Sequence, residues 1–444
     1  MKKKATLTRQ LILEILLEVS KGEFLHIVQK AVLDKYDYLD DKDRTFIKRL
    51  SSGCVERMLT LDYIIDQFSK TPVKKCKIVI AWILRMAVYQ MYFMDSVPDS
   101  AAVNEAVNLC CDKGFYNLKG FVNGVLRNIS RSEKISDYPD LSVKYSIPEE
   151  VIGILKDYLK SDEVIETMLL KSLEAPNLTV RVNTSKITVE ACIQLLKEDG
   201  VLVNYAPYFD NALIIKTHKG LECLEVFRKG FITVMDISSM FVASIIEPKA
   251  YMKVLDLCSA PGGKTYHVAD MMGDAGKIIS CDISDYKVSL IKEGANRQGF
   301  NCINPIIRDA LSDEADFLEE EFDVIIADLP CSGLGVMGRK ADIKYRIQTK
   351  DIESLAKLQK DILKNNIKYL KKGGLLLFST CTVSACENYE NYKFIKDEMG
   401  LTPVPFDKKL PKDLISDSAK DGYLQLIPGI HKCDGFFVSL FMKE

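Results

Sequence analysis

The sequence lacks an apolar run long enough to cross a membrane. Across its 444 residues, no uninterrupted hydrophobic segment approaches the roughly 20 residues that a membrane-spanning helix needs. The first 20 residues, MKKKATLTRQLILEILLEVS, are expected to form an amphipathic helix packed on the surface, because Glu14 and Glu18 interrupt the apolar run and the apolar residues recur at helical spacing. We therefore expect an unexported, cytoplasmic protein that does not contact a membrane.

Metal-ligand and disulfide patterns are also missing. The 13 cysteines are an odd number without framework spacing, and no Cys-x-x-Cys pair or His/Cys cluster is spaced as zinc ligands are. This pattern indicates free thiols in a reducing compartment. We expect no bound metal, and we expect a monomer.

Positive and negative residues are nearly balanced, since the formal net charge is -2. This balance excludes a polycationic protein. Residues 1–140 nevertheless contain 22 Lys and Arg against 18 Asp and Glu, a net charge of +4. A mildly basic amino-terminal part suits an anionic partner that is contacted through local patches.

Three regions differ in their periodicity. Residues 5 to about 133 have helical spacing with few strand signals, and breaks are predicted at Lys21-Gly22, Thr71-Pro72 and Val97-Pro98. We expect an all-α bundle over residues 1–135. For residues 136–235 we expect a linker and a small α+β domain with a helix over 189–198. This domain is either a platform for single-stranded nucleic acid or a spacer.

From residue 236 to 444, strand candidates alternate with helical segments. The strands read KVLDLCS, KIISCDIS, NCINPIIRD, FDVIIADLP and GGLLLFSTC, and DGFFVSLFMKE supplies a last strand. This alternation predicts an α/β fold of the Rossmann-like type, a doubly wound parallel sheet with right-handed crossovers. In such a sheet, ligands bind beyond the carboxyl ends of the strands.

The first of these strands runs into a Pro-Gly-Gly turn in VLDLCSAPGGKT. Asp282 lies 20 residues beyond Gly262, the usual place of an acidic residue that accepts hydrogen bonds from ribose hydroxyls. The loop itself reads SAPGGK and not Gly-x-Gly-x-x-Gly, so we expect an adenosine derivative without a pyrophosphate, S-adenosyl-L-methionine. Asp309 would then lie near the adenine edge.

Two cysteines follow strand ends at the same edge of the predicted sheet. Cys331 comes after Asp328-Leu329-Pro330, and Cys381 after Ser379-Thr380. Cys258 and Cys281 are most simply small buried residues. Two thiols beside a methyl donor suggest covalent catalysis, in which a thiolate adds to carbon 6 of a pyrimidine and makes carbon 5 nucleophilic. The residues alone do not say which thiol attacks.

Together, VLDLCSAPGGKT, DLPCSGLG, STCTVSACEN and DGFFVSLF resemble the RsmB/Nop2/Sun family of RNA cytosine-5 methyltransferases. The resemblance implies that Cys381 is the nucleophile, that Cys331 releases the product, and that Asp328 orients the target base or transfers a proton to it. It also implies a donor site with these members: Cys258, Ser259, Ala260, Pro261, Gly262, Gly263, Lys264, Asp282, Asp309 and Asp328. A reactive Cys381 needs a lowered pKa, and no His or Lys adjoins it in sequence.

Three amino-terminal stretches, LDDKDRTFIKRLSSG, ILRMAVYQMYFMDSVPDSAAVNEAV and LKGFVNGVLRNISR, resemble the NusB-like RNA-binding domain. With this domain, the chain resembles the members of the family that methylate the 16S ribosomal RNA of the small subunit. The resemblance makes that RNA the expected partner. The candidate RNA contacts are Arg44, Lys48, Arg49, Lys119, Arg127, Arg181, Arg339, Lys344 and Arg346. Methylation of transfer RNA, or a non-catalytic RNA-binding role in ribosome assembly, remain alternatives.

Overall fold

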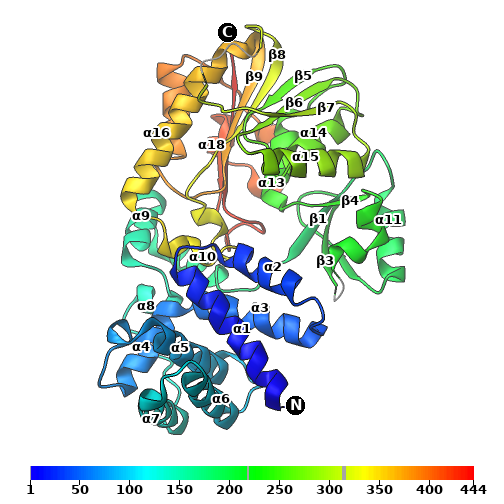
Figure 1. Ribbon diagram of the computed structural model, residues 1–444. Helices are drawn as coiled ribbons and strands as arrows, with labels where there is room; N and C mark the ends of the chain where they lie inside the picture. The colour runs from blue at the N-terminus through cyan, green and yellow to red at the C-terminus, as the bar shows by residue number, and fades with distance from the viewer. Residues whose placement is uncertain (1, 218–219, 313–316) are drawn as a thin grey trace. The chain divides into compact units, whose positions relative to one another are not determined.

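The computed structural model describes residues 2–217, 220–312 and 317–444, with side chains from residue 7 onward (Figure 1). The chain divides into two compact units. The first contains residues 1–153 together with 337–346, and the second contains residues 154–336 and 347–444. Within the described residues, no helix is long and apolar enough to cross a membrane.

The first unit is helical, as the periodicity predicts. Its helices are α1 (Lys2–Ser20), α2 (Leu25–Lys35), α3 (Asp41–Glu56), α4 (Met58–Phe68), α5 (Ile78–Phe93), α6 (Asp99–Asp112), α7 (Lys119–Arg131) and α8 (Leu141–Tyr145), and α9 (Glu149–Leu159) contains the division at Gly153. The three predicted breaks fall between α1 and α2, α4 and α5, and α5 and α6. The apolar helix α5 is buried along most of its length, because α1, α3, α4, α6 and α7 pack around it.

Residues 337–346 belong to the first unit, although the sequence places them directly after DLPCSGLG. Lys344 is buried there and its Nζ donates to the carbonyl oxygen of Glu56 at 2.7 Å. The guanidinium of Arg346 donates to the carbonyl oxygens of Gly22 and Glu23. The expectation that Lys344 contacts RNA is therefore corrected, because its ammonium is enclosed by the bundle. Arg346 is engaged with backbone, whereas Arg339 is exposed.

A small four-stranded antiparallel sheet begins the second unit. The strands β1 (Leu178–Val182), β2 (Leu202–Tyr205), β3 (Ala212–Lys216) and β4 (Ile232–Val234) lie in the order β2-β3-β1-β4. Helix α10 (Asp162–Lys171) precedes it, and α11 (Val189–Glu198) and α12 (Glu225–Arg228) cover it. The α+β prediction is thus confirmed, including the bounds of α11, but β4 was not predicted.

The large sheet contains the predicted parallel strands. They are β5 (Lys253–Asp256), β6 (Lys277–Asp282), β7 (Ile303–Ile307), β8 (Phe322–Asp328) and β9 (Leu370–Thr380), and β10 (Thr402–Pro403), β11 (Tyr423–Leu426) and β12 (Phe436–Met442) extend the sheet. The order is β10-β12-β9-β8-β5-β6-β7, with β11 also paired to β12. The sheet is parallel from β7 to β9, but β12 pairs antiparallel with β9.

Helices cover both faces of this sheet, because neighbouring residues of each strand point to opposite sides. Val254, Ile278 and Val324 pack in one core with α13 (Ile237–Ile246), α14 (Gly263–Met271) and α15 (Asp285–Gln298). Leu255 and Ile279, one residue further along, pack in the other core with α16 (Thr349–Asn366). Helices α17 (Tyr389–Lys393) and α18 (Asp417–Lys420) complete the unit. The doubly wound Rossmann-like prediction is confirmed.

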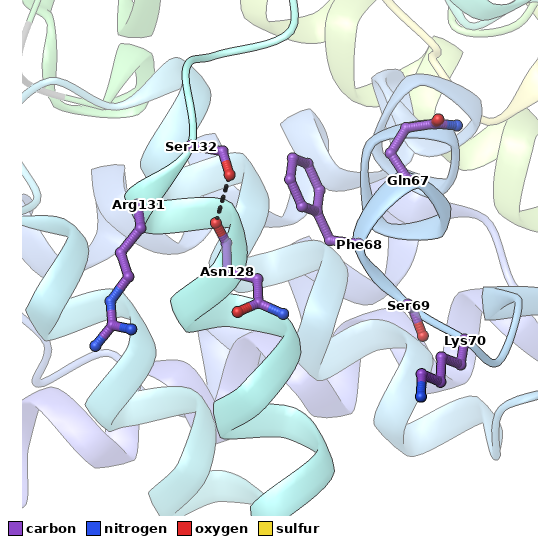
Figure 2. A pocket seen from close by; sticks show the side chains of 7 residues that line it. All are labelled: Gln67, Phe68, Ser69, Lys70, Asn128, Arg131 and Ser132. Atoms are coloured by element: carbon purple, nitrogen blue, oxygen red, sulfur yellow. Dashed lines mark hydrogen bonds between the residues drawn. The ribbon is translucent and has the colours of Figure 1, made fainter.

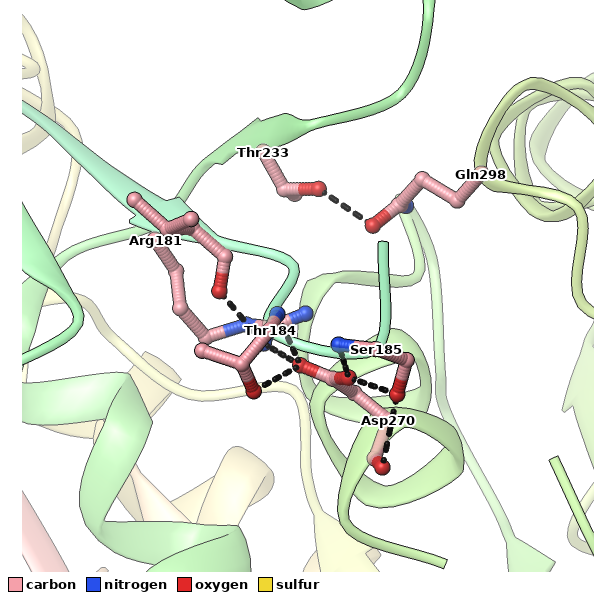
Figure 3. Close-up of polar contacts among 7 residues, drawn as sticks. Arg181, Thr184, Ser185, Thr233, Asp270 and Gln298 are labelled. Carbon is pink, nitrogen blue, oxygen red and sulfur yellow. Dashed lines mark hydrogen bonds and ion pairs between the residues drawn. The ribbon is translucent and has the colours of Figure 1, made fainter. Parts of the chain in front are cut away.

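Arg181 on β1 is fully buried and forms an ion pair with Asp270 on α14, shown in Figure 3. The Asp270 carboxylate also accepts hydrogen bonds from the backbone N–H groups of Thr184, at 3.3 Å, and Ser185, at 3.0 Å. The expectation that Arg181 contacts RNA is corrected, because its guanidinium is enclosed by protein. Through this ion pair, Arg181 links the small sheet to α14, the helix that follows the Pro-Gly-Gly turn.

We expect Arg181→Met to lower the free energy of unfolding by about 3 kcal/mol or more, since the buried Asp270 carboxylate loses its charged partner. Urea denaturation measures this change, with the exposed Arg228→Met on α12 as the control. The salt dependence of RNA binding should keep its slope in Arg181→Met. A flatter salt dependence of RNA binding, with an unchanged free energy of unfolding, would instead indicate that Arg181 contacts RNA.

Candidate functional site

The expected site residues gather at the carboxyl edge of the parallel strands, at the point where the strand order reverses. Strand β5 lies between β6 and β8, so the chain leaves β5 in one direction and returns on its other side at β8. Such a switch point leaves a crevice between the loops that follow the two strands. The donor loop follows β5 and Asp328 ends β8, so both border this crevice.

The donor loop, residues 257–262, is held by hydrogen bonds to the neighbouring strand β6. The N–H and Oγ of Ser259 both donate to the carbonyl oxygen of Cys281, each at 2.9 Å. Gly262 has φ +106°, and a Cβ there would collide with the ring of Tyr266, so only glycine fits. A Gly-x-Gly-x-x-Gly spacing does occur at residues 333–338, but a 3-10 turn and no helix start lies there.

A cavity of about 170 Å³ opens beside this loop. It is lined by Val234, Met235, Asp236, Ser239, Asp256, Cys258, Ser259, Ala260, Pro261, Gly263, Lys264 and Asp328. Asp256 Oδ2 accepts a hydrogen bond from Thr265 Oγ1 at 2.6 Å, whereas its buried Oδ1 has no partner within the described residues. An unpaired carboxylate oxygen in a cavity suits a cationic group, and S-adenosyl-L-methionine carries one at its amine and one at its sulfonium sulfur. The residues therefore fit the donor.

Asp282 ends β6 and Asp309 follows β7, as predicted. Asp282 is buried; its Oδ2 accepts from the N–H of Ala260 at 3.3 Å, and its Oδ1 pairs with Lys287 at 3.2 Å. It therefore lies directly against the donor loop. Asp309 is exposed, and its carboxylate accepts from the N–H of Leu311 at 2.9 Å.

Lys264 connects the donor loop to the end of β8. Its Nζ lies 2.6 Å from Asp328 Oδ2, and Ser379 Oγ of β9 donates to Asp328 Oδ1 at 2.8 Å. Burial lowers the pKa of Lys264, but the Asp328 carboxylate and, more weakly, a negative charge on Cys381 leave it above the ordinary value. The ammonium is thus charged and close enough to Cys381 to attract its thiolate. Lys264 lies far from Cys381 in sequence, so the residues that adjoin Cys381 give no sign of this attraction.

The two cysteines lie in contact, with 3.3 Å between Cys331 Sγ and Cys381 Sγ. They meet because β8 and β9 are parallel neighbours that pair Asp328 with Ser379, so the chain leaves both strands at the same level. The hydrogen bond to Cys381, together with burial, holds the pKa of the Cys331 thiol well above its usual value. A raised pKa favours the protonated form of Cys331. Burial also raises the pKa of Cys258, which lines the cavity as a thiol.

Two site residues were missed from the sequence. Asp256 stands inside the apolar run VLDL, where it reads as an ordinary strand residue. Glu387 is buried and its carboxylate accepts hydrogen bonds from Ser332, beside Cys331. Their positions in the sequence could have pointed to them, since Asp256 ends the first predicted strand and Glu387 lies within the motif STCTVSACEN.

A second cavity, of about 480 Å³, lies in the first unit at the ends of α4 and α7 (Figure 2). It is lined by Gln67, Phe68, Ser69, Lys70, Asn128, Arg131 and Ser132. The exposed Lys70 and Arg131 give it a positive charge. Among the expected RNA contacts of this unit, Lys48, Arg49, Lys119 and Arg127 are also exposed, and Arg44 is half-buried and donates to the carbonyl oxygen of Leu33.

A doubly wound sheet with a cavity at its switch point that fits S-adenosyl-L-methionine is an arrangement that suits a methyltransferase, and comparisons with known proteins show that class. Residues 243–442 match the family "16S rRNA methyltransferase RsmB/F". Residues 154–222 match the ferredoxin-like domain of RsmF/B-like methyltransferases, and residues 6–131 match the NusB family. The chain belongs to the RsmB/F family of 16S rRNA methyltransferases.

Relatives cover the chain over nearly its whole length. It is 34% identical to the probable ribosomal RNA small subunit methyltransferase B of Bacillus subtilis, over 99% of this chain and 100% of that protein. The corresponding probable methyltransferase of Synechocystis is 31% identical over 98% and 99%. The crystal structure of PH0851 has the same fold, with a TM-score of 0.82 at 23% identity over 97% of each chain. NSun6 from Pyrococcus horikoshii with SFG has a TM-score of 0.58 at 23% identity, over 67% of this chain and 98% of that one.

We expect donor binding to weaken below about pH 7, because burial raises the pKa of Asp256 to about 7. A cationic ligand favours the ionised carboxylate, so in acid a proton must leave before the donor binds, and affinity falls by at most about tenfold per pH unit. Thr265 and Lys264 favour the charged form of Asp256, while Asp328 and Asp282 oppose it. Calorimetry across this pH range measures the effect. Asp256→Asn should bind weakly without this pH dependence, and the exposed Asp417→Asn should behave as the native protein does.

Proposed function

We propose that the protein transfers the methyl group of S-adenosyl-L-methionine to carbon 5 of one cytosine in 16S ribosomal RNA, through a covalent adduct with Cys381. The observation that carries this proposal is the contact of two thiols, 3.3 Å apart, beside Lys264 and Asp328 of the donor cavity. Carbon 5 of a cytosine is a poor nucleophile until a group adds to carbon 6. A thiolate supplies that group.

The charges favour Cys381 as the nucleophile and Cys331 as the group that completes the reaction. Lys264 attracts a Cys381 thiolate, while the hydrogen bond to Cys381 keeps Cys331 protonated. When the Cys381 thiolate adds to carbon 6, a carbon–sulfur bond forms and the electrons of the 5,6 double bond move toward ring nitrogen 3. Carbon 5, now nucleophilic, would take the methyl group that the bound donor supplies, and the electrons of the broken methyl–sulfur bond would stay on the donor's sulfur.

Release of the product needs a base for the proton on carbon 5. Once Cys381 is bonded to carbon 6, its negative charge is gone, and so is the largest cause of the raised pKa of Cys331. Cys331 then loses its proton to water more easily and takes the proton from carbon 5. The electrons of that C–H bond restore the double bond, and the Cys381 thiolate leaves. The two thiols thus act in sequence.

Asp328 is the residue that we propose contacts the target cytosine. Lys264 and Ser379 donate to its two oxygens, so the carboxylate is fixed at the end of β8 between the donor cavity and the cysteines. A carboxylate there can accept a hydrogen bond from the exocyclic amine of cytosine, and in its protonated form the same group can pass a proton to ring nitrogen 3. Lys264, Asp282 and the donor loop would hold the donor, and Asp309 its adenine edge.

The substrate part of the proposal is supported by the relatives, which are named for the small-subunit ribosomal RNA. RNA is usually recognised at unstacked bases, and reaction at a base requires the nucleotide to leave its stack. We propose that residues 1–135 and 136–235 contact RNA and that residues 236–444 perform the chemistry. Exposed cations of the first unit, among them Lys48, would contact phosphates. A cytoplasmic location and a monomer remain predictions.

Bisulfite mapping of ribosomal and transfer RNA from cells lacking the protein tests the proposal. We expect one cytosine of 16S ribosomal RNA to lose its methyl group, and the purified protein to restore it with S-adenosyl-L-methionine. Loss in a transfer RNA would reassign the substrate. Loss at no cytosine, together with no donor binding by calorimetry, would favour a non-catalytic role in ribosome assembly.

A further inference from the structure

We propose that Glu387 is a positioning residue that holds the Cys331 thiol against Cys381 for the release step. The inference rests on the proposed function of the two thiols. Glu387 lies six residues beyond Cys381, and its side chain reaches the loop that carries Cys331. It therefore ties the loop after β9 to the loop after β8.

The Glu387 carboxylate accepts a dense set of hydrogen bonds. The N–H of Ser332 donates to Oε1 at 2.8 Å, and the hydroxyl of Ser332 donates to Oε2 at 2.5 Å. Gln359 Nε2 on α16 also donates to Oε1, at 3.3 Å. Glu387 is fully buried, so these donors take the place of water around the carboxylate.

Both neighbours of Cys331 are held by this set of bonds. Ser332, on one side, is bound by Glu387, and the carbonyl oxygen of Pro330, on the other side, accepts from the same Gln359 Nε2 at 2.8 Å. Ser332 Oγ also lies 2.6 Å from Thr382 Oγ1, next to Cys381. The backbone on each side of Cys331 is thus fixed with respect to the residue that follows Cys381.

A carboxylate is suited to this place because it only accepts hydrogen bonds. An amide would turn one of its two oxygens into a donor. At Oε1 this donor would face the N–H of Ser332 and the amide of Gln359, and at Oε2 it would force the Ser332 hydroxyl to turn and accept. Burial raises the pKa of Glu387, and the donors from Ser332, Gln359 and Ser384 favour its charged form. No part of this set includes Lys264, Asp328 or the donor loop.

The geometry therefore separates two steps of the reaction. Addition to carbon 6 and methyl transfer depend on Cys381, Lys264, Asp328 and the donor, whereas release depends on the thiol of Cys331 reaching the proton on carbon 5. Glu387→Gln should disturb the second step more than the first. The covalent complex of protein and methylated RNA should then accumulate during turnover.

The experiment compares Glu387→Gln, Ser332→Ala and the exposed control Glu390→Gln in the full-length protein, with 16S ribosomal RNA from cells lacking the protein. For Glu387→Gln and Ser332→Ala we expect kcat to fall by roughly tenfold or more, as for loss of a hydrogen bond to a charged group. The single-turnover rate of methyl transfer should change much less. Denaturing electrophoresis should show more RNA-linked protein than in the native enzyme.

Three outcomes decide between the possibilities. If Cys331→Ala accumulates the covalent complex but both variants turn over as Glu390→Gln does, the role of Glu387 is refuted and the proposed function stands. If the variants lose methyl transfer and release equally, with a lower Tm, Glu387 is only structural. If no variant and no native enzyme forms a complex or 5-methylcytosine, the proposed function itself fails.

Discussion

Replacing Cys381 by alanine is expected to abolish methyl transfer, with kcat reduced by about 10⁴-fold or more, because the carbon nucleophile is never formed. Cys381 follows β9 at the carboxyl edge of the sheet, where the Lys264 ammonium attracts its thiolate. We expect no replacement by the neighbouring thiol of Cys331, because its sulfur lies at a different position, 3.3 Å from the Cys381 sulfur. Transfer of labelled methyl groups to 16S ribosomal RNA measures the loss.

The control for this variant is Cys386→Ala, which removes a half-buried thiol five residues further along the same segment. It should retain activity. Calorimetry should find that Cys381→Ala still binds S-adenosyl-L-methionine, because Cys381 does not belong to the lining of the donor cavity. A Cys381→Ala protein that still forms a covalent RNA complex would transfer the role of nucleophile to Cys331.

The parts of the site that sequence reasoning found are those fixed by strand ends. Parallel neighbours such as β8 and β9 end at the same edge, so an aspartate or cysteine after an apolar run is brought to that edge whatever the rest of the chain does. This holds for Asp282, Asp328, Cys331 and Cys381. Their chemical roles came from family resemblance and remain predictions.

The basic residues show that local sequence does not distinguish a surface cation from a buried one. Lys344 and Arg181 read as surface cations, yet each is buried by groups far away in sequence, the Glu56 carbonyl and the Asp270 carboxylate. Nothing in the local spacing announces such a partner, because the energy that places a buried charge comes from tertiary contacts. Asp256 and Glu387 were missed because each stands in a stretch that is predicted to be buried, where a single polar residue gives no sign of a functional role.

Cys331→Ala should give the opposite phenotype to Cys381→Ala: one round of methyl transfer, followed by a trapped complex. The variant keeps Cys381, Lys264 and Asp328, so addition and methyl transfer remain possible, but it loses the thiol that lies 3.3 Å from Cys381 and takes the proton from carbon 5. Without that proton transfer the Cys381–carbon 6 bond cannot break by elimination. We expect multiple turnover to fall by roughly 10² to 10⁴, the usual contribution of a general base.

Mass spectrometry of the trapped complex provides the decisive measurement, because it identifies both ends of the link. The peptide joined to RNA should contain Cys381, and the nucleotide should carry the added methyl group. A linked nucleotide without the methyl group would mean that Cys331 acts before methyl transfer, in addition to carbon 6 or in orienting the base. The double variant Cys331→Ala, Cys381→Ala should form no complex, since the bond that Cys331 would break is then never made.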